Sequence, residues 1–266
     1  LVSVYFLSGA LWSLPGGMLT DRWGSTRALR TSAALAALIA ISVATGGRSW
    51  TSLVVLFAIG GAAVPLADTG GARAISAGVP LDRQGLAFGG KEASIPIASM
   101  LAGLAVPALG AQLGWRSAYV VAAAVAALAI ALIPRGLDEQ LEPSTTRAPA
   151  PERVEPAPER VEPAGKAPAG TWLVLTALAF AAALAGAAGN SAPTFLVSSA
   201  IAADFTESNA GFLLAVASTA GIGVRLFSGV VADRGGITER RLMGLLMISG
   251  AGGMALLAIG GTWGML

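Results

Sequence analysis

The stretch Gly17-Met-Leu-Thr-Asp21-Arg22-Trp-Gly24 closes a long apolar run and is followed by Arg27. A second stretch, Gly229-Val-Val-Ala-Asp233-Arg234-Gly-Gly236, closes another apolar run and is followed by Arg240. In each copy the first glycine lets a neighbouring helix pack closely. The Asp can cap or face the positive N-terminal end of a helix, and the last glycine permits a tight turn. The repeat therefore predicts two equivalent turns between helices.

The composition places the chain among membrane proteins. Of its 266 residues, 55% are hydrophobic and 12% are charged, against about 25% charged in soluble domains. The net charge of +2 gives no reason to expect a nucleic-acid partner. Cys and His are both absent, so we expect no disulfide and no thiol chemistry, and the usual metal ligand is missing. No catalytic arrangement is visible in the sequence, so we expect neither an enzyme nor a bound metal or cofactor.

Apolar runs of membrane-spanning length recur along the whole chain. A span needs about 20 mostly apolar residues, and eight stretches qualify: roughly 1–19, 28–46, 52–72, 86–111, 116–134, 171–197, 209–231 and 241–260. Strand-like alternation does not recur, and backbone groups in lipid must be satisfied within the segment. The sequence therefore predicts an all-α, polytopic membrane protein.

The arginines between the predicted spans indicate the orientation. Eight of them lie in or beside alternate loops: Arg22, Arg27, Arg30, Arg73, Arg83, Arg234, Arg240 and Arg241. The other short loops hold only Arg48 and Arg116. Because basic residues favour the cytoplasmic side, we expect loops 20–27, 73–85 and 232–240 in the cytoplasm. The expected location is the cell membrane (plasma or inner), crossed many times.

A segment of different composition separates two groups of spans. Residues 135–170 hold seven of the fourteen prolines and a perfect tandem repeat of Pro-Glu-Arg-Val-Glu-Pro-Ala at 151–164. Such a segment cannot bury a core. We expect a disordered cytoplasmic linker that tethers two bundles, at 1–134 and 171–266, and a docking site for a partner is the alternative.

The paired loops resemble the signature loop of the major facilitator superfamily, which lies between that family's second and third helices and again between its eighth and ninth. The resemblance covers the whole chain and implies two pseudo-symmetric helical bundles, with a small-molecule solute bound between them and moved by alternating access. It makes the eight spans similar to helices two to nine of twelve. We therefore expect a fragment truncated at both ends that does not transport by itself. The signature loops would latch one of the two transport states.

Four charged residues within the predicted spans stand out, because a charge inside the membrane is expensive and marks a functional hypothesis: Asp68, Lys91, Glu92 and Arg225. The spacing Arg225-x-x-x-Gly229-x-x-x-Asp233 looks like that of carboxylate-transporting branches of the superfamily, in which the Arg binds the substrate anion. A structural pair with a neighbouring carboxylate is the alternative.

The other intramembrane polar residues have two interpretations each. Lys91 and Glu92 are adjacent, so their side chains start about 100° apart and are not expected to face each other. For Asp68 a structural pair with Arg73 or Lys91 is the main expectation. With no His, coupling to protons would need Asp68 or Glu92. Asn190 comes shortly before Pro193, where a tolerated kink is the main expectation. The alternative is a break of the sixth span that would let Asn190 offer polar groups to the substrate path.

The sequence thus predicts a secondary transporter in a lipid bilayer for a small solute, with an organic anion and coupled protons as the favoured substrate and co-ion. Two alternatives stay open. One is a multidrug efflux antiporter, although Gly103 to Ala111 keeps only part of the Gly-Pro signature of that class. The other is a receptor or scaffold that acts through the linker without transport.

Overall fold

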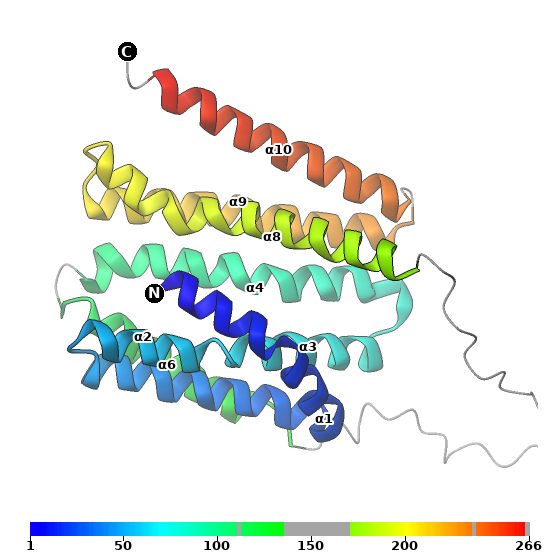
Figure 1. The fold of residues 1–266 in the computed structure, drawn as a ribbon, viewed down its shortest axis with the longest axis horizontal. Coiled ribbons are helices and arrows are strands. Elements are labelled where there is room, and N and C mark those ends of the chain that lie inside the picture. Colours follow the sequence, from blue (N-terminus) through cyan, green and yellow to red (C-terminus); the bar gives the residue numbers. More distant parts are fainter. Residues whose placement is uncertain (111–112, 136–170, 236–237, 264–266) are drawn as a thin grey trace, which may run out of the picture. The chain divides into compact units, whose positions relative to one another are not determined.

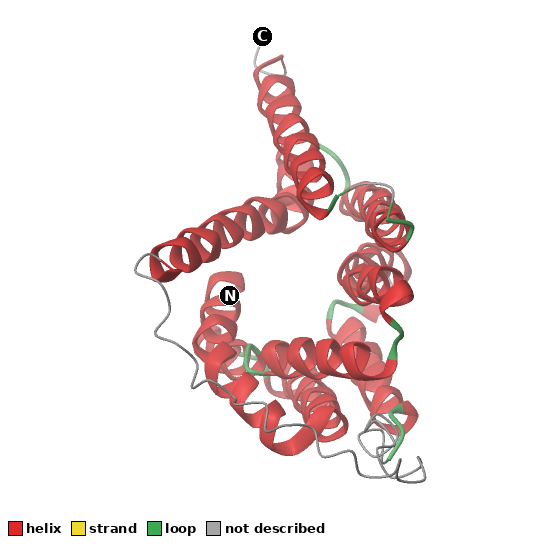
Figure 2. Cartoon of the chain, turned by 90° about the vertical axis from the view of Figure 1, so that its right-hand side faces the viewer, coloured by secondary structure: helices red, strands yellow, loops and turns green. Residues whose placement is uncertain are grey.

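The computed structural model describes residues 1–110, 113–135, 171–235 and 238–263, and they form helices joined by short turns with no strand among them (Figure 2). The all-α prediction is therefore confirmed for this part of the chain. The predicted linker at 135–170 lies outside the described residues, apart from Arg135. Its disorder and the bundle boundaries beside it stay predictions.

The chain divides into two compact units. The first comprises Leu1–Glu142 and Leu196–Leu242, and the second comprises Pro143–Phe195 and Met243–Leu266. The first unit therefore holds all helices up to residue 135, together with the helix that ends at Asp233. This unit contains both signature loops and all four charged residues singled out above. Asp68, Lys91 and Glu92 lie in its N-terminal segment, and Arg225 lies on the helix that ends at Asp233.

The first helical segment, α1 (Val2–Gly46), consists of two limbs. Gly24 separates them with φ 81° and ψ 171°, a left-handed φ that a side chain rarely tolerates, and the chain doubles back there (Figure 1). A straight helix of 45 residues would be roughly 68 Å long at 1.5 Å per residue, twice the bilayer core. The two limbs match the predicted spans 1–19 and 28–46.

The next span is kinked in its middle. Its first part is α2 (Trp50–Gly60), which starts with a capping box between Ser49 and Ser52, and its second part is α3 (Ala63–Gly78). The Ser8 hydroxyl donates to the carbonyl of Ala58, and the Ser32 hydroxyl donates to the carbonyl of Ala63 at 2.7 Å. Both limbs of α1 therefore supply hydroxyls that cover backbone carbonyls around the kink.

The chain continues through a short 3-10 turn, η1 (Leu81–Arg83), into α4 (Gln84–Ala105) and the π-helical turn η2 (Val106–Gly110). The next helix is α6 (Arg116–Leu132). These elements agree with the predicted spans 86–111 and 116–134.

The three remaining helices are α8 (Thr171–Ala202), α9 (Glu207–Asp233) and α10 (Glu239–Trp263). The Thr206 side chain caps α9 by accepting from the backbone N–H of Asn209. The helix α8 runs through Pro193 without interruption, so the alternative of a break in this span is wrong. The polar residues there bond within their own helix, as when the Thr194 hydroxyl donates to the carbonyl of Asn190 at 2.6 Å.

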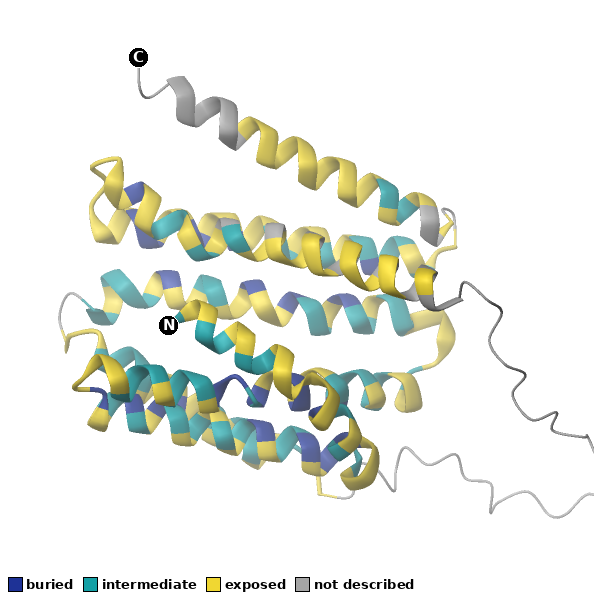
Figure 3. Cartoon of the chain, in the orientation of Figure 1, coloured by how far each residue is buried: buried dark blue, intermediate teal, exposed yellow. Residues whose placement is uncertain are grey.

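Among the described residues, four stretches are long and apolar enough to cross a membrane: Val2–Gly46, Trp50–Gly78, Leu81–Gly110 and Glu207–Asp233. The helix α6 is a shorter apolar helix. Many large apolar side chains on these helices are exposed, as those of Leu14 and Leu128 are, while most buried residues are small. Figure 3 shows the buried positions along the ribbon. Outward apolar side chains and small buried ones are the pattern of helices packed in lipid. The fold is that of an all-α polytopic membrane protein.

Helices α4 and α9 pack in close antiparallel contact, although the predicted linker separates them in sequence. A Cβ placed on Gly89 would lie 2.6 Å from the carbonyl oxygen of Arg225, and one on Gly103 would lie 2.5 Å from that of Gly211. Backbone-to-backbone approach of this kind requires glycine because no side chain fits. The seam runs nearly the full length of α4 and fixes its N-terminus beside the end of α9.

Candidate functional site

The second signature loop binds the start of α4. The carboxylate of Asp233, the last residue of α9, accepts hydrogen bonds from the backbone N–H of Gly85 at 2.6 Å and of Leu86 at 2.7 Å. The first N–H groups of a helix have no partner within the helix and carry its positive partial charge. The predicted role of this Asp at a helix N-terminus is therefore confirmed for Asp233.

Two glycines shape this loop. A Cβ on Gly229 would lie 2.5 Å from the carbonyl oxygen of Gly85, so the predicted close packing at the first position is confirmed here. The left-handed turn falls on Gly235, with φ 64°. Arg234 beside it is exposed. Gly236 and the side chain of Arg240 lie outside the described part of the chain.

The first signature loop makes different contacts. Asp21 is exposed and pairs with Arg73 of α3 at 3.6 Å. Arg22 and Arg27 are exposed as well. Gly24 takes the predicted tight turn with its positive φ. The two copies therefore share their turn chemistry, while their aspartates contact different partners.

The predicted packing role of Gly17 is wrong. Among the described residues, a Cβ on Gly17 would meet nothing within 4 Å, whereas one on Gly16 would lie 3.0 Å from the Cβ of Pro65. The physical reason is the rotation of this limb about its axis, which turns the preceding residue toward α3. The buried Thr20, one turn later, shares a hydroxyl hydrogen bond of 2.7 Å with Thr69 on the same face.

Three of the predicted intramembrane charges form one cluster. The ammonium of Lys91 contacts Oδ1 of Asp68 and lies 2.9 Å from Oε1 of Glu92. The expected pairing of Asp68 with Lys91 is thus observed, and Arg73 pairs elsewhere. The expectation that Lys91 and Glu92 do not face each other is wrong, because the long Lys side chain bends back to reach its neighbour's carboxylate.

Arg225 stands apart from that cluster. Its side chain is half-buried on α9, and its carbonyl lies against Gly89. No ion pair or side-chain hydrogen bond joins its guanidinium to another residue in the described part of the chain. The alternative of a structural pair with a neighbouring carboxylate therefore has no support among these residues.

Asn190 belongs to the second compact unit. It donates from its amide nitrogen to the carbonyl of Gly186, 2.8 Å away in its own helix. This contact satisfies a helix carbonyl and directs the amide along the helix.

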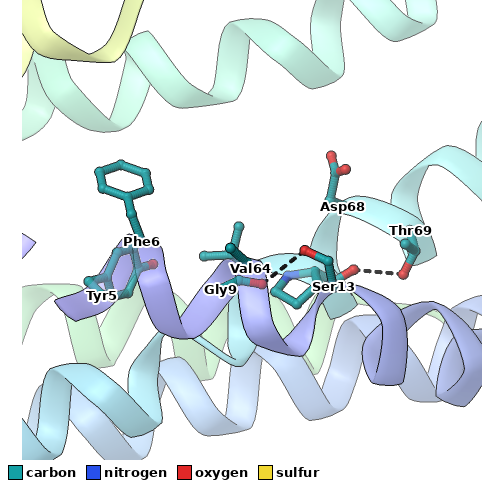
Figure 4. A pocket seen from close by; sticks show the side chains of 9 residues that line it. Tyr5, Phe6, Gly9, Ser13, Val64, Asp68 and Thr69 are labelled. Carbon is teal, nitrogen blue, oxygen red and sulfur yellow. Dashed lines mark hydrogen bonds between the residues drawn. The ribbon is translucent and has the colours of Figure 1, made fainter. Parts of the chain in front are cut away.

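A pocket of about 260 Å³ opens between the first limb of α1 and α3 (Figure 4). Its lining combines aromatic, hydroxyl and charged side chains: Tyr5, Phe6, Gly9, Ala10, Ser13, Val64, Pro65, Asp68 and Thr69. Asp68 had been singled out from the sequence, but the α1 residues had not. Their only sequence signal is an apolar run in which Ser and Gly recur, which is common to most spans.

Gly85 and Leu86 were also missed by sequence reasoning. They act through their backbone N–H groups, and no side-chain motif marks such a role. In the described residues no group of three or more His, Cys, Asp or Glu is placed to hold a metal ion.

The comparisons with known proteins agree with the paired loops and the helices. The family model of the Major Facilitator Superfamily matches residues 1–266. No curated protein matches the chain, and no solved structure matches it. Because the family match spans the chain from end to end, the predicted membership is confirmed. The chain belongs to the major facilitator superfamily of secondary transporters.

Proposed function

We propose that this protein moves a small organic solute by alternating access, and that Asp233 holds the cytoplasmic end of the pathway closed. The observation that carries the proposal is the pair of hydrogen bonds from Gly85 and Leu86 to the Asp233 carboxylate. They join α9 to α4, which lie on opposite sides of the predicted linker at 135–170. In this proposal, loops 73–85 and 232–240 lie on the cytoplasmic side of the plasma or inner membrane.

The two hydrogen bonds to Asp233 have a strength that suits an equilibrium between two transport states. Hydrogen bonds to a charged group contribute about 1.5–3 kcal/mol each when buried, and the half-buried position of Asp233 reduces that figure. A net contribution of one or two kcal/mol shifts a two-state population roughly five- to thirty-fold. Such a latch can favour one state without preventing the other.

For the solute we infer a small organic anion. The half-buried guanidinium of Arg225 has no anionic partner among the described residues, whereas Lys91 is already neutralised by two carboxylates. A planar guanidinium binds a carboxylate through two parallel hydrogen bonds, so Arg225 supports this inference better than Lys91 does. Protons remain the proposed co-ion, with Asp68 or Glu92 as the carrier.

Distance measurements by electron paramagnetic resonance test the latch. The chain has no Cys, so labels can be placed at Asp82→Cys and Arg234→Cys, two exposed positions on either side of the contact. We expect one short distance in this pair, and a second, longer population after Asp233→Asn. Unchanged distances after this substitution would contradict the latch.

A further inference from the structure

The ammonium of Lys91 marks a position where two carboxylates converge on one cation. Its Nζ contacts Oδ1 of Asp68 on α3 and lies 2.9 Å from Oε1 of Glu92 on α4. The positive charge of Lys91 compensates the mutual repulsion of the two carboxylates. The ammonium group of Lys91 thus shows where a cation is held between α3 and α4.

The cluster carries more negative charge than its own ammonium neutralises. Two carboxylates face one Lys, and no other cationic side chain pairs with either of them in the described residues. The Lys91 side chain is 19% exposed and that of Asp68 is 62% exposed. Asp68 therefore keeps an accessible carboxylate edge, and its Oδ2 has no hydrogen-bond donor among the described residues.

Asp68 belongs to the lining of the 260 Å³ pocket, and so do the aromatic residues Tyr5 and Phe6. Figure 4 shows Asp68 and Phe6 pointing to the same side of the two helices that form the pocket, toward its two ends. The faces of aromatic rings attract cations. A pocket lined by a carboxylate and by aromatic rings therefore suits an ammonium ion and disfavours an anion.

The pocket also contains hydroxyl groups, whose oxygens can accept hydrogen bonds from an ammonium ion. Ser13 donates its proton to the carbonyl of Gly9 at 2.9 Å, so its oxygen offers lone pairs that accept hydrogen bonds from an ammonium group. The Thr69 hydroxyl lies 2.6 Å from the carbonyl of Pro65 and 2.7 Å from the hydroxyl of Thr20. The volume lies just below the range of about 300–1,000 Å³ for drug-sized ligands, so the ligand is small.

We propose that this pocket binds a small primary organic ammonium ion, with Asp68 as its counter-ion and Lys91 as the built-in competitor. When the ligand enters, its ammonium takes the Asp68 carboxylate, and Lys91 keeps Glu92. When the site empties, Lys91 again bridges both carboxylates. One ammonium replaces another, so neither carboxylate is left without a cation. This site is separate from the proposed anion site at Arg225 and does not depend on the latch. Asp68 is also one of the two proposed proton carriers, so a bound ammonium ion leaves Glu92 for that role.

Calorimetric titration of the purified chain in lipid nanodiscs tests the site. The probes are benzylamine, benzyl alcohol and benzoate, which share a ring and differ in charge. We expect saturable binding of benzylamine that is at least tenfold tighter than that of the other two. Asp68→Asn should weaken benzylamine tenfold or more. The control Asp204→Asn removes an exposed carboxylate at a positive-φ position that Asn accepts, and it should leave binding unchanged.

If Lys91 competes with the ligand for Asp68, its removal should strengthen ligand binding, whereas removal of a purely structural ion pair should not. Lys91→Gln removes the competing ammonium and frees both carboxylates. We expect benzylamine to bind about tenfold more tightly to this variant, which corresponds to roughly 1.4 kcal/mol. Lys91→Arg keeps the competitor and should leave the affinity close to that of the unchanged protein.

Three outcomes would overturn the proposal: no saturable benzylamine binding, equal binding of the three probes, or weaker binding by Lys91→Gln with the helical content intact. If Lys91→Gln does not fold, the Asp68→Asn and Lys91→Arg results decide. Binding is measured without transport, so failure here leaves the alternating-access proposal standing.

Discussion

Gly85 and Gly229 pack backbone against backbone: a Cβ on Gly85 would lie 2.6 Å from the carbonyl oxygen of Gly229, and the converse distance is 2.5 Å. The next contact up the seam joins Gly89 to Arg225 in the same way. A step of one helical turn along α4 therefore matches one turn in the opposite direction along α9. Because side chains are absent at these points, the helices approach closely enough for the Asp233 carboxylate to reach the first N–H groups of α4.

Two adjacent glycines of α4 offer a matched test of this seam. Gly89→Ala places a methyl group 2.6 Å from the Arg225 carbonyl oxygen, and backbone cannot move aside cheaply. Gly90→Ala meets nothing within 4 Å and gains only the helix propensity of Ala, up to about 1 kcal/mol. We expect thermal unfolding in detergent to show Gly89→Ala less stable by about 1–3 kcal/mol and Gly90→Ala unchanged or more stable. Equal midpoints for the two variants would contradict the seam.

The two signature aspartates should differ in their contribution to stability. Asp21 makes an exposed ion pair of 3.6 Å with Arg73, its side chain being 79% exposed, and such pairs contribute about 0–1 kcal/mol. Asp233 accepts two backbone hydrogen bonds at a helix N-terminus. We therefore expect Asp233→Asn to lower the free energy of unfolding by about 1–2 kcal/mol, and Asp21→Asn to change it by less than half of that. A larger loss for Asp21→Asn would reverse this ranking.

Gly16 and Gly17 form a second adjacent pair. A methyl group at Gly16 would press on the stiff ring of Pro65, whose Cβ lies 3.0 Å away, while Gly17 faces open space. We expect Gly16→Ala to destabilise the contact between α1 and α3 by about 0.5–1.5 kcal/mol. Gly17→Ala serves as the control and should stabilise the limb slightly. Loss of stability in Gly17→Ala alone would show that the motif glycine, and not its neighbour, is the packing residue.

The anion inference is tested through Arg225. Uptake of radiolabelled small carboxylates into proteoliposomes should fall tenfold or more with Arg225→Ala. Arg225→Lys should keep part of the uptake, because the charge remains while the bidentate geometry is lost. The half-buried side chain makes no described ion pair, so we expect the unfolding midpoint to change little in either variant. Equal uptake by Arg225→Ala and the unchanged protein would contradict the inference.

The order of the helices, the turn at Gly24 and the membrane class were predictable from the chain alone. Each depends on local properties: the length of an apolar run, the φ range open to glycine, and the small share of charged residues. The family followed from the repetition of one short motif at two turns. The motif also predicted a carboxylate at a helix end, because Asp233 lies one helical turn after Gly229, where the apolar run stops.

Tertiary structure decided which residues meet. The backbone N–H groups of Gly85 and Leu86 as partners of Asp233, the choice of Gly16 over Gly17, and the convergence of Asp68 and Glu92 on Lys91 all depend on how each helix is rotated against its neighbour. That rotation is set by the packing of the whole helix face, and a change of one residue in register turns a helix by about 100°. The sequence by itself determined that charged residues lie at the paired turns and within the spans, and only the packing of the helices determined what they contact.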